Sequence, residues 1–205
     1  MKLPIALSNK HIHLSQADID VLFGQGYELT HKKDLSQPGQ FACEEMVEVV
    51  GPKGSTKMRV LGPARPESQV EVSLADARGL GIAVPVRQSG DTEGTPGCKL
   101  VGPKGEVEMT KGVIVAARHI HMSLEDAERF GVKDKDVVSV QTTGERALLF
   151  NNVLVRANAA FALEMHVDLE EGNAAGVKNG DLVELVKLFY INKKVCALHI
   201  PFICF

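Results

Sequence analysis

The tripeptide His11-Ile12-His13 and its repeat, His119-Ile120-His121, decide how this 205-residue chain is organised. Residues two apart on an extended strand point to the same side, so each pair presents two imidazoles to one place. Imidazole is the commonest metal-ligating side chain in proteins. Two such pairs in one chain predict a two-metal site that arose by duplication.

The sequences around the two pairs also match. Ser15 and Ser123 follow the pairs as candidate N-caps, each with an aspartate three residues later, and each predicted helix ends at a glycine, Gly24 or Gly131. Short apolar strands are expected before the pairs, at residues 5–8 and 113–117. The two copies are offset by 108 residues (119 minus 11), so each half of the chain carries one copy.

A second pair of matching segments supplies a further ligand to each half. Residues 69–77 lead to Gly81 and residues 163–171 lead to Gly176, and alignment on these glycines sets Glu71 opposite His166. The predicted ligand sets are therefore His11, His13 and Glu71 in one half, and His119, His121 and His166 in the other. Three protein ligands leave a position open for water or substrate, and nitrogen-rich ligation favours zinc.

Composition bounds the class of protein. A net charge of −3 gives no basic surface for nucleic acid, and no apolar run reaches the ~20 residues that a membrane span requires. Four scattered cysteines are typical of a reduced, cytoplasmic protein. Nineteen glycines, nine prolines and many valine-rich runs favour short strands and tight turns, so we expect a mainly β fold.

Three other segments carry weaker signals. Val-Gly-Pro-Lys-Gly occurs at residues 50–54 and 101–105 and is interpreted as a hairpin tip, because no helix follows to make it a phosphate loop. Residues 88–98 are expected to form a surface loop, and the apolar tail at 187–205 is atypical and receives no function. His31 has no counterpart and is expected at the surface.

Arg65 lies six residues before Glu71, where its guanidinium could hold an oxyanion through two hydrogen bonds. Lys33, Arg59 and Arg118 add positive charge nearby in the sequence. Beside a cationic metal centre these residues suggest an anionic substrate, such as phosphate or a phosphorylated cofactor.

Several motifs together resemble the phosphate propanoyltransferases of the propanediol-utilisation type, over roughly residues 4 to 186. The similar segments are residues 7–15, 35–42, 59–65, 69–73, 117–123 and 166–168. The resemblance implies transfer of an acyl group between coenzyme A and phosphate, with acyl-CoA, phosphate and acyl phosphate as ligands. It also implies a mainly β fold of two small β-barrels related by the internal repeat, with short capping helices and two zinc ions per chain. One barrel would comprise residues 1–9 and 117–186, the other residues 10–116, and the tail would span 187–205.

The resemblance also assigns residue roles. His11, His13 and Glu71 would hold one zinc ion, and His119, His121 and His166 the other. Arg65 matches the arginine that engages phosphate. Positions lining the coenzyme A site are matched by Ser8, Lys33, Arg59, Leu61, His166 and Asn173.

Family members that enter bacterial microcompartments carry an N-terminal encapsulation segment, which is not seen here. The expected location is the cytoplasm, with a microcompartment and its shell or enzymes as an alternative. We expect a homo-oligomer, a dimer, with neither nucleic acid nor membrane as a partner.

The expected reaction is direct attack of phosphate on the thioester, because no cysteine or serine in the motifs has an evident base partner. Two alternatives stay open from the residues alone. A two-metal hydrolase would release free acid, although only Glu71 is available as a carboxylate ligand. A zinc-stabilised assembly module would have metal sites closed by four protein ligands.

Overall fold

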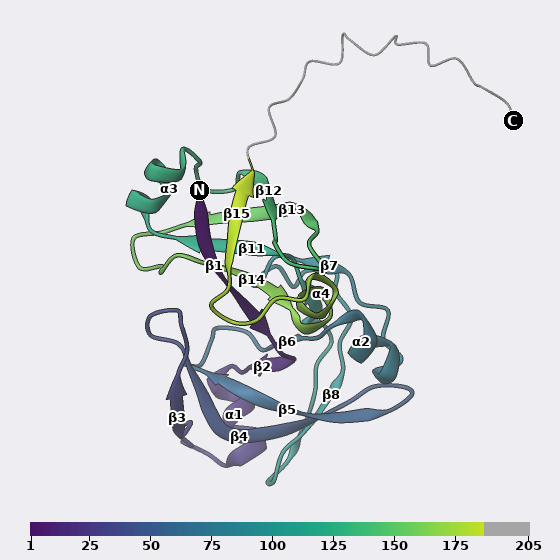
Figure 1. Cartoon of the computed structure of the whole chain (residues 1–205). Coiled ribbons are helices and arrows are strands. Elements are labelled where there is room, and N and C mark those ends of the chain that lie inside the picture. Colours follow the sequence, from purple (N-terminus) through teal and green to yellow (C-terminus); the bar gives the residue numbers. More distant parts are fainter. Residues whose placement is uncertain (187–205) are drawn as a thin grey trace, which may run out of the picture.

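The computed structural model describes residues 1–186, and within them the chain is mainly β, with four short helices (Figure 1). The prediction of the fold class is confirmed. The predicted atypical tail at 187–205 lies outside the described residues. Within residues 1–186, no helix has the length and apolar character needed to span a membrane.

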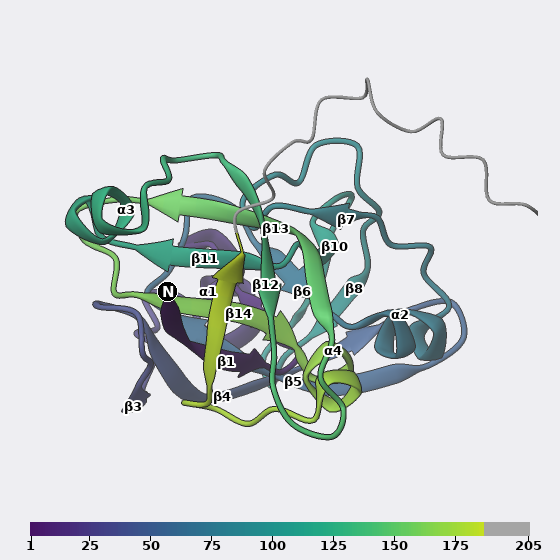
Figure 2. The same ribbon diagram turned by 45° about the horizontal axis from the view of Figure 1, so that its top comes forward.

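Six strands close into a barrel in the order β1-β14-β11-β13-β12-β15 (Figures 1 and 2). Their bounds are β1 Lys2–Ser8, β11 His119–Met122, β12 Val137–Gln141, β13 Leu149–Ala157, β14 Glu164–Asp168 and β15 Leu182–Val186. Fully buried Ile5, Ile120, Val155 and Met165 belong to the hydrophobic cluster that fills this barrel. Helices α3 (Leu124–Phe130) and α4 (Leu169–Ala175) follow its ligand-bearing strands.

The remaining strands form an open, curled sheet in the order β7-β10-β6-β2-β5-β4-β8-β9, with β3 added beside β4. Their bounds are β2 His11–His13, β3 His31–Asp34, β4 Phe41–Val50, β5 Ser55–Gly62, β6 Gln69–Glu71, β7 Val86–Arg87, β8 Lys99–Val101, β9 Glu106–Glu108 and β10 Val113–Ala116. A second hydrophobic cluster lies against this sheet and includes residues of α1 (Gln16–Phe23) and α2 (Leu74–Leu80). The second sheet is thus a half-barrel whose edges stay open.

The internal repeat is visible in the pairing of the strands. Strand β2 runs parallel to β5 and antiparallel to β6, and β11 runs parallel to β13 and antiparallel to β14. His11 lies opposite Glu71 in the first half, and His119 lies opposite His166 in the second. The same register therefore brings the third ligand to the first histidine in both halves.

The strands that precede the two histidine pairs are exchanged between the sheets. Strand β1, which leads to β2 along the chain, pairs in parallel with β14 of the barrel. Strand β10, which leads to β11, pairs in parallel with β6 of the open sheet. Strand β6, which carries Glu71, therefore lies between β2 and β10, and β14, which carries His166, lies between β11 and β1. In each case one neighbour carries the histidine pair of the same half, and the other leads into the histidine pair of the other half. The two sheets have separate hydrophobic cores, as the predicted division into two domains requires. The division itself stays a prediction.

The predicted helix ends are confirmed. The side chains of Ser15 and Ser123 accept hydrogen bonds from the backbone N–H groups of Asp18 and Asp126, the helices end at Phe23 and Phe130, and a glycine follows each. At α4 the N-cap is Asp168, which forms a reciprocal capping box with Glu171.

Both Val-Gly-Pro-Lys-Gly segments are hairpin tips, as expected, and each one contacts the C-terminal end of a helix. The backbone N–H of Lys53 donates to the carbonyl of Leu80 at 3.0 Å, and that of Lys104 donates to Leu22 at 3.0 Å. A Cβ at Gly51 would lie 2.3 Å from the Leu80 carbonyl oxygen, so only glycine permits this approach. The repeated motif therefore satisfies helix carbonyls that lack a partner inside their helix.

Candidate active site

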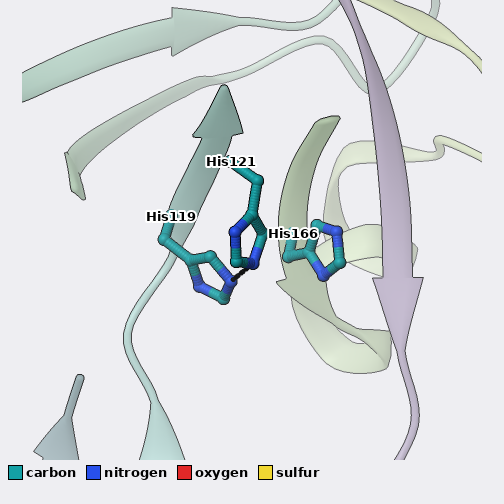
Figure 3. Close-up of side chains that lie close together, drawn as sticks. All are labelled: His119, His121 and His166. Atoms are coloured by element: carbon teal, nitrogen blue, oxygen red, sulfur yellow. Dashed lines mark hydrogen bonds between the residues drawn. The ribbon is translucent and has the colours of Figure 1, made fainter. Parts of the chain in front are cut away.

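The second predicted ligand set converges as a triad of imidazoles. His119 and His121 project from β11 and His166 from the adjacent β14 (Figure 3). The Nε2 atoms of His119 and His121 are 3.1 Å apart, and the ring centroids of His119 and His166 are 5.1 Å apart. The candidate ligand atoms of all three residues lie within 4.8 Å of one another.

The first predicted set converges in the same way in the open sheet. His11 and His13 come from β2 and Glu71 from the end of β6, and all three side chains are buried. His11 Nε2 lies 3.5 Å from Glu71 Oε2. Gln69 Nε2 and Ser89 Oγ donate to the other oxygen, Glu71 Oε1, at 2.6 and 2.7 Å, so that Oε2 remains available to a ligand.

The first histidine of each pair is held by the backbone. His11 Nδ1 lies 2.8 Å from the carbonyl oxygen of Asn9, and His119 Nδ1 lies 2.9 Å from that of Ala117. A carbonyl oxygen can only accept, so Nδ1 carries the proton and the lone pair is on Nε2. This is the arrangement in which metal-ligating histidines are usually oriented.

Both triads fit a metal ion on two observations. The Nδ1 atoms of His13 and His121 are buried and have no hydrogen-bond partner among the described residues, so the protein leaves one polar atom of each ring unsatisfied. Two ligands about 2.05 Å from a tetrahedral zinc ion lie roughly 3.3 Å apart. The ligand-atom separations of 3.1 Å in one triad and 3.5 Å in the other lie on either side of this value.

Burial keeps several of these imidazoles neutral. It lowers the pKa of His13 to about 3, of His119 to about 4 and of His121 to about 2, with neighbouring histidines adding to the effect. Neutral imidazole is the form that binds metal, so these three side chains are ready to ligate at neutral pH.

Glu71 is held as a carboxylate. Burial acts to raise its pKa, but the positive potential of His11 and His13 and the hydrogen bond from Ser89 outweigh burial and lower the pKa to about 2. The negative charge of Glu71 in turn acts to raise the pKa values of His119 and His121 in the other half, against the larger effect of burial. The two triads are therefore electrostatically coupled.

Both triads line one cavity of about 890 Å³ between the two sheets. Arg65 and four of the six predicted coenzyme A positions line it directly: Ser8, Lys33, Arg59 and Leu61. His166, the fifth of these positions, lines it as part of its triad. Asn173 lies on the exposed side of α4, away from the lining, and Asn179 lines the cavity instead.

Arg118, which the sequence suggested as further positive charge near the site, has a carboxylate partner. Its guanidinium pairs with Glu171 and also lies over the ring of Phe150. Arg118 is not among the residues that line the cavity. The charge of Arg118 is therefore paired with Glu171 and does not face the cavity.

Sequence reasoning missed several polar residues of the cavity, among them Arg156 and Ser89. Arg156 of β13 lies opposite His121, and its guanidinium is 5.7 Å from the ring centroid of Phe161. Ser89, from the loop after β7, contacts Arg65, Gln69 and Glu71. Neither residue had a local signal in the sequence, because strand pairing brings Arg156 beside His121 and tertiary contacts bring the loop of Ser89 to the site.

Comparisons with known proteins give a single family. A sequence model of the phosphate propanoyltransferase family matches residues 4–178. A phosphate propanoyltransferase of Thermotoga maritima is 55% identical over 185 residues, which cover 89% of this chain and 88% of the relative. Relatives with the same name from Clostridioides difficile and Salmonella typhimurium are 50% and 53% identical, over 90% and 86% of this chain and 89% and 85% of their own.

Proposed function

The chain belongs to the phosphate propanoyltransferase family and is an acyltransferase, and from this premise we propose that it interconverts propanoyl-CoA plus phosphate and propanoyl phosphate plus CoA in the cavity between its triads. One observation carries the proposal. Six metal-ligand side chains from both copies of the repeat line a cavity that also receives Arg65 and Arg156. Among residues 1–186 neither arginine forms an ion pair, so both guanidinium groups are available to anionic substrates.

We propose that His11, His13 and Glu71 hold one zinc ion and that His119, His121 and His166 hold the other. When bound, zinc would supply Lewis acidity toward the thioester carbonyl and the phosphate oxygens. The donor sets support this proposal, since three nitrogen or oxygen ligands per site leave a coordination position free for substrate.

The arginines act on phosphate in this proposal. Arg65 is partly buried, and its Nη1 donates to Ser89 Oγ at 3.3 Å, a contact that orients its guanidinium. Arg65 would donate two hydrogen bonds to a phosphate dianion and offset part of the negative charge of the phosphate. Arg156, braced against Phe161 on the other side of the cavity, would stabilise the negative charge that develops on the carbonyl oxygen.

Coenzyme A would enter along the residues that the resemblance assigns to it, Ser8, Lys33, Arg59, Leu61 and His166. Lys33 and Arg59 would attract its phosphate groups. The resemblance also assigns Asn173 to the coenzyme A site, but Asn173 is not among the residues that line the cavity, so only the resemblance supports its role.

The reaction proceeds by direct attack in this proposal: a phosphate oxygen forms a bond to the carbonyl carbon, the carbon–sulfur bond breaks, and CoA leaves as the thiolate. Cys43 and Cys98 are buried in the core of the open sheet, and burial raises their thiol pKa values to about 11 and 12, so neither is a nucleophile. Ser89 does have a carboxylate partner, Glu71. That carboxylate, with a pKa of about 2, is a poor base for a serine hydroxyl.

Cellular location, in the cytoplasm or a bacterial microcompartment, stays a prediction. So do the role in propanediol degradation, the association with microcompartment shell or enzymes, and the homodimeric state.

The proposal is tested by thiol release from propanoyl-CoA with and without phosphate, on protein whose zinc content is known. We expect phosphate-dependent release with about two zinc ions per chain. Arg65→Ala should lose phosphate use and retain zinc, whereas Arg129→Ala, at an exposed position of α3, should behave like the wild type. Release that ignores phosphate would indicate a hydrolase, and no release from zinc-loaded protein would favour an assembly role.

A further inference from the structure

The third ligand of each triad has a polar neighbour two residues earlier on the same strand. Gln69 precedes Glu71 on β6, and Glu164 precedes His166 on β14. Gln69 lies opposite His13 and Glu164 lies opposite His121 in the strand register. Gln69 and Glu164 therefore occupy equivalent positions in the two copies of the repeat.

The hydrogen-bonding chemistry of these two positions is reversed between the halves. Gln69 Nε2 donates to Glu71 Oε1 at 2.6 Å. Glu164 Oε2 lies 2.8 Å from His166 Nε2, and because a carboxylate accepts, the imidazole is the donor. Where the third ligand is a carboxylate the neighbour is an amide donor, and where it is an imidazole the neighbour is a carboxylate acceptor.

We propose that Gln69 and Glu164 are positioning residues that orient the third ligand of each triad, Glu164 by holding His166 as the Nε2–H tautomer with the Nδ1 lone pair free for a metal. This inference rests on the proposed metal centre. Carboxylate–histidine–metal arrangements of this kind fix both the tautomer and the direction of the ring. The third ligand and its neighbour both differ between the two halves. In each half, therefore, the neighbour offers the hydrogen-bonding group that the third ligand needs.

Glu164 is itself held by the other half of the protein. Ser36 Oγ, from the segment between β3 and β4, donates to Glu164 Oε2. The next residue, Gln37, is buried and makes two hydrogen bonds to Ala162, donating to its carbonyl at 3.0 Å and accepting from its N–H at 3.2 Å. The segment that lines the cavity beside Lys33 thus contacts the support of the second triad.

The first test measures tautomers in metal-free protein by long-range ¹H–¹⁵N NMR of the histidine rings. In the wild type His166 should be the Nε2–H tautomer, while His11 and His119 should be Nδ1–H. Glu164→Ala should convert His166 to a mixture of tautomers, and Glu164→Gln should retain Nε2–H because its amide oxygen still accepts. An Nδ1–H tautomer of His166 in the wild type, or an unchanged tautomer in Glu164→Ala, would overturn the proposal.

The second test measures zinc affinity at both sites by competition with a chromophoric chelator. Glu164→Ala should weaken one of the two sites by about 10–100-fold, the usual effect of removing such a support, and Glu164→Gln should restore most of the affinity. Gln69→Leu should weaken only the other site, which keeps the test decisive if Glu164→Ala does not fold. Glu145→Ala, at an exposed position, is the control. Equal weakening of both sites by either variant contradicts the assignment.

The outcomes separate this inference from the proposed function. Tautomer data come from metal-free protein and depend on neither turnover nor phosphate. A wild type that binds zinc but shows no phosphate-dependent thiol release would refute the proposed function and leave the positioning roles standing.

Discussion

The metal-free protein should lose stability steeply as the pH falls from 7 to 5. The pKa values of His13, His119 and His121 are lowered to about 3, 4 and 2 in the folded protein, whereas an unfolded chain returns each to its ordinary value of about 6.5. Between these limits the unfolded state binds protons that the folded state does not, so the free energy of unfolding decreases as the pH decreases.

The size of the effect follows from the shifts. Each of the three groups contributes a loss of about 1.36 kcal/mol for every pH unit below roughly 6.5, as long as the pH stays above its folded value. At pH 5 the loss is about 2 kcal/mol per histidine and about 6 kcal/mol for three, against a total stability of about 5–15 kcal/mol for a typical domain. The pKa of Glu71 is lowered from 4.5 to about 2, so its contribution is lost only below this range.

Urea denaturation in the presence of a chelator, followed by circular dichroism at pH 7, 6 and 5, measures this loss. His13→Asn should reduce the pH-dependent decrease by about a third, because one of three shifted groups is removed. His31→Gln, at an exposed position outside both triads, is the matched control. Bound zinc should raise the free energy of unfolding at pH 7 by mass action, since the folded state alone presents the assembled ligands.

A free energy of unfolding that stays constant between pH 7 and 5 in metal-free wild type would refute this reasoning. It would mean that the imidazoles already accept protons in the folded state, and hence that burial does not hold them in the ligating form. A decrease of equal size in His13→Asn would instead assign the effect to other groups.

Three further predictions concern packing and chemistry. Gly51→Ala should lower stability by about 1–3 kcal/mol in urea denaturation, because its Cβ meets the Leu80 carbonyl, whereas Gly79→Ala, with open space in helix α2, should raise it by about 0.5–1 kcal/mol. Ser89→Ala should lower kcat/KM for propanoyl-CoA by about 10–100-fold through the lost hydrogen bond to a charged group, and complete loss together with an acyl-serine found by mass spectrometry would contradict direct attack. Phe130→Ala should cost about 3–5 kcal/mol in unfolding free energy while zinc stoichiometry stays unchanged, since Phe130 is buried in the barrel core and outside the cavity lining.

The ligand triads could be predicted from the sequence because their determinants are local. A two-residue spacing on a strand fixes which side chains share a face, and the N-cap serines and terminal glycines fix the helices that follow. Duplication added a second, independent copy of each signal. Alignment of the two copies then identified Glu71 and His166, which the structure brings to their respective histidine pairs.

The supports of the site could not be found in this way. Ser89 reaches Glu71 from a loop 18 residues away, and Ser36 reaches Glu164 across 128 residues, so both contacts depend on tertiary packing. The equivalence of Gln69 and Glu164 was equally hidden, because their residue types differ and only the strand register relates them. The role of the Lys53 and Lys104 turns as helix-end partners likewise requires the positions of α1 and α2.

The exchange of leading strands explains how a chain with an internal repeat can hold two candidate metal-ligand triads against one cavity. Strands β6 and β14, which carry the third ligands, are interior strands, hydrogen-bonded on both sides. One of the two flanking strands in each case, β10 for β6 and β1 for β14, leads along the chain directly into the histidine pair of the other sheet. A displacement of either triad would therefore strain the backbone that positions the other. Such coupling would hold the candidate ligands in a fixed geometry, as the proposed reaction between two anionic substrates requires.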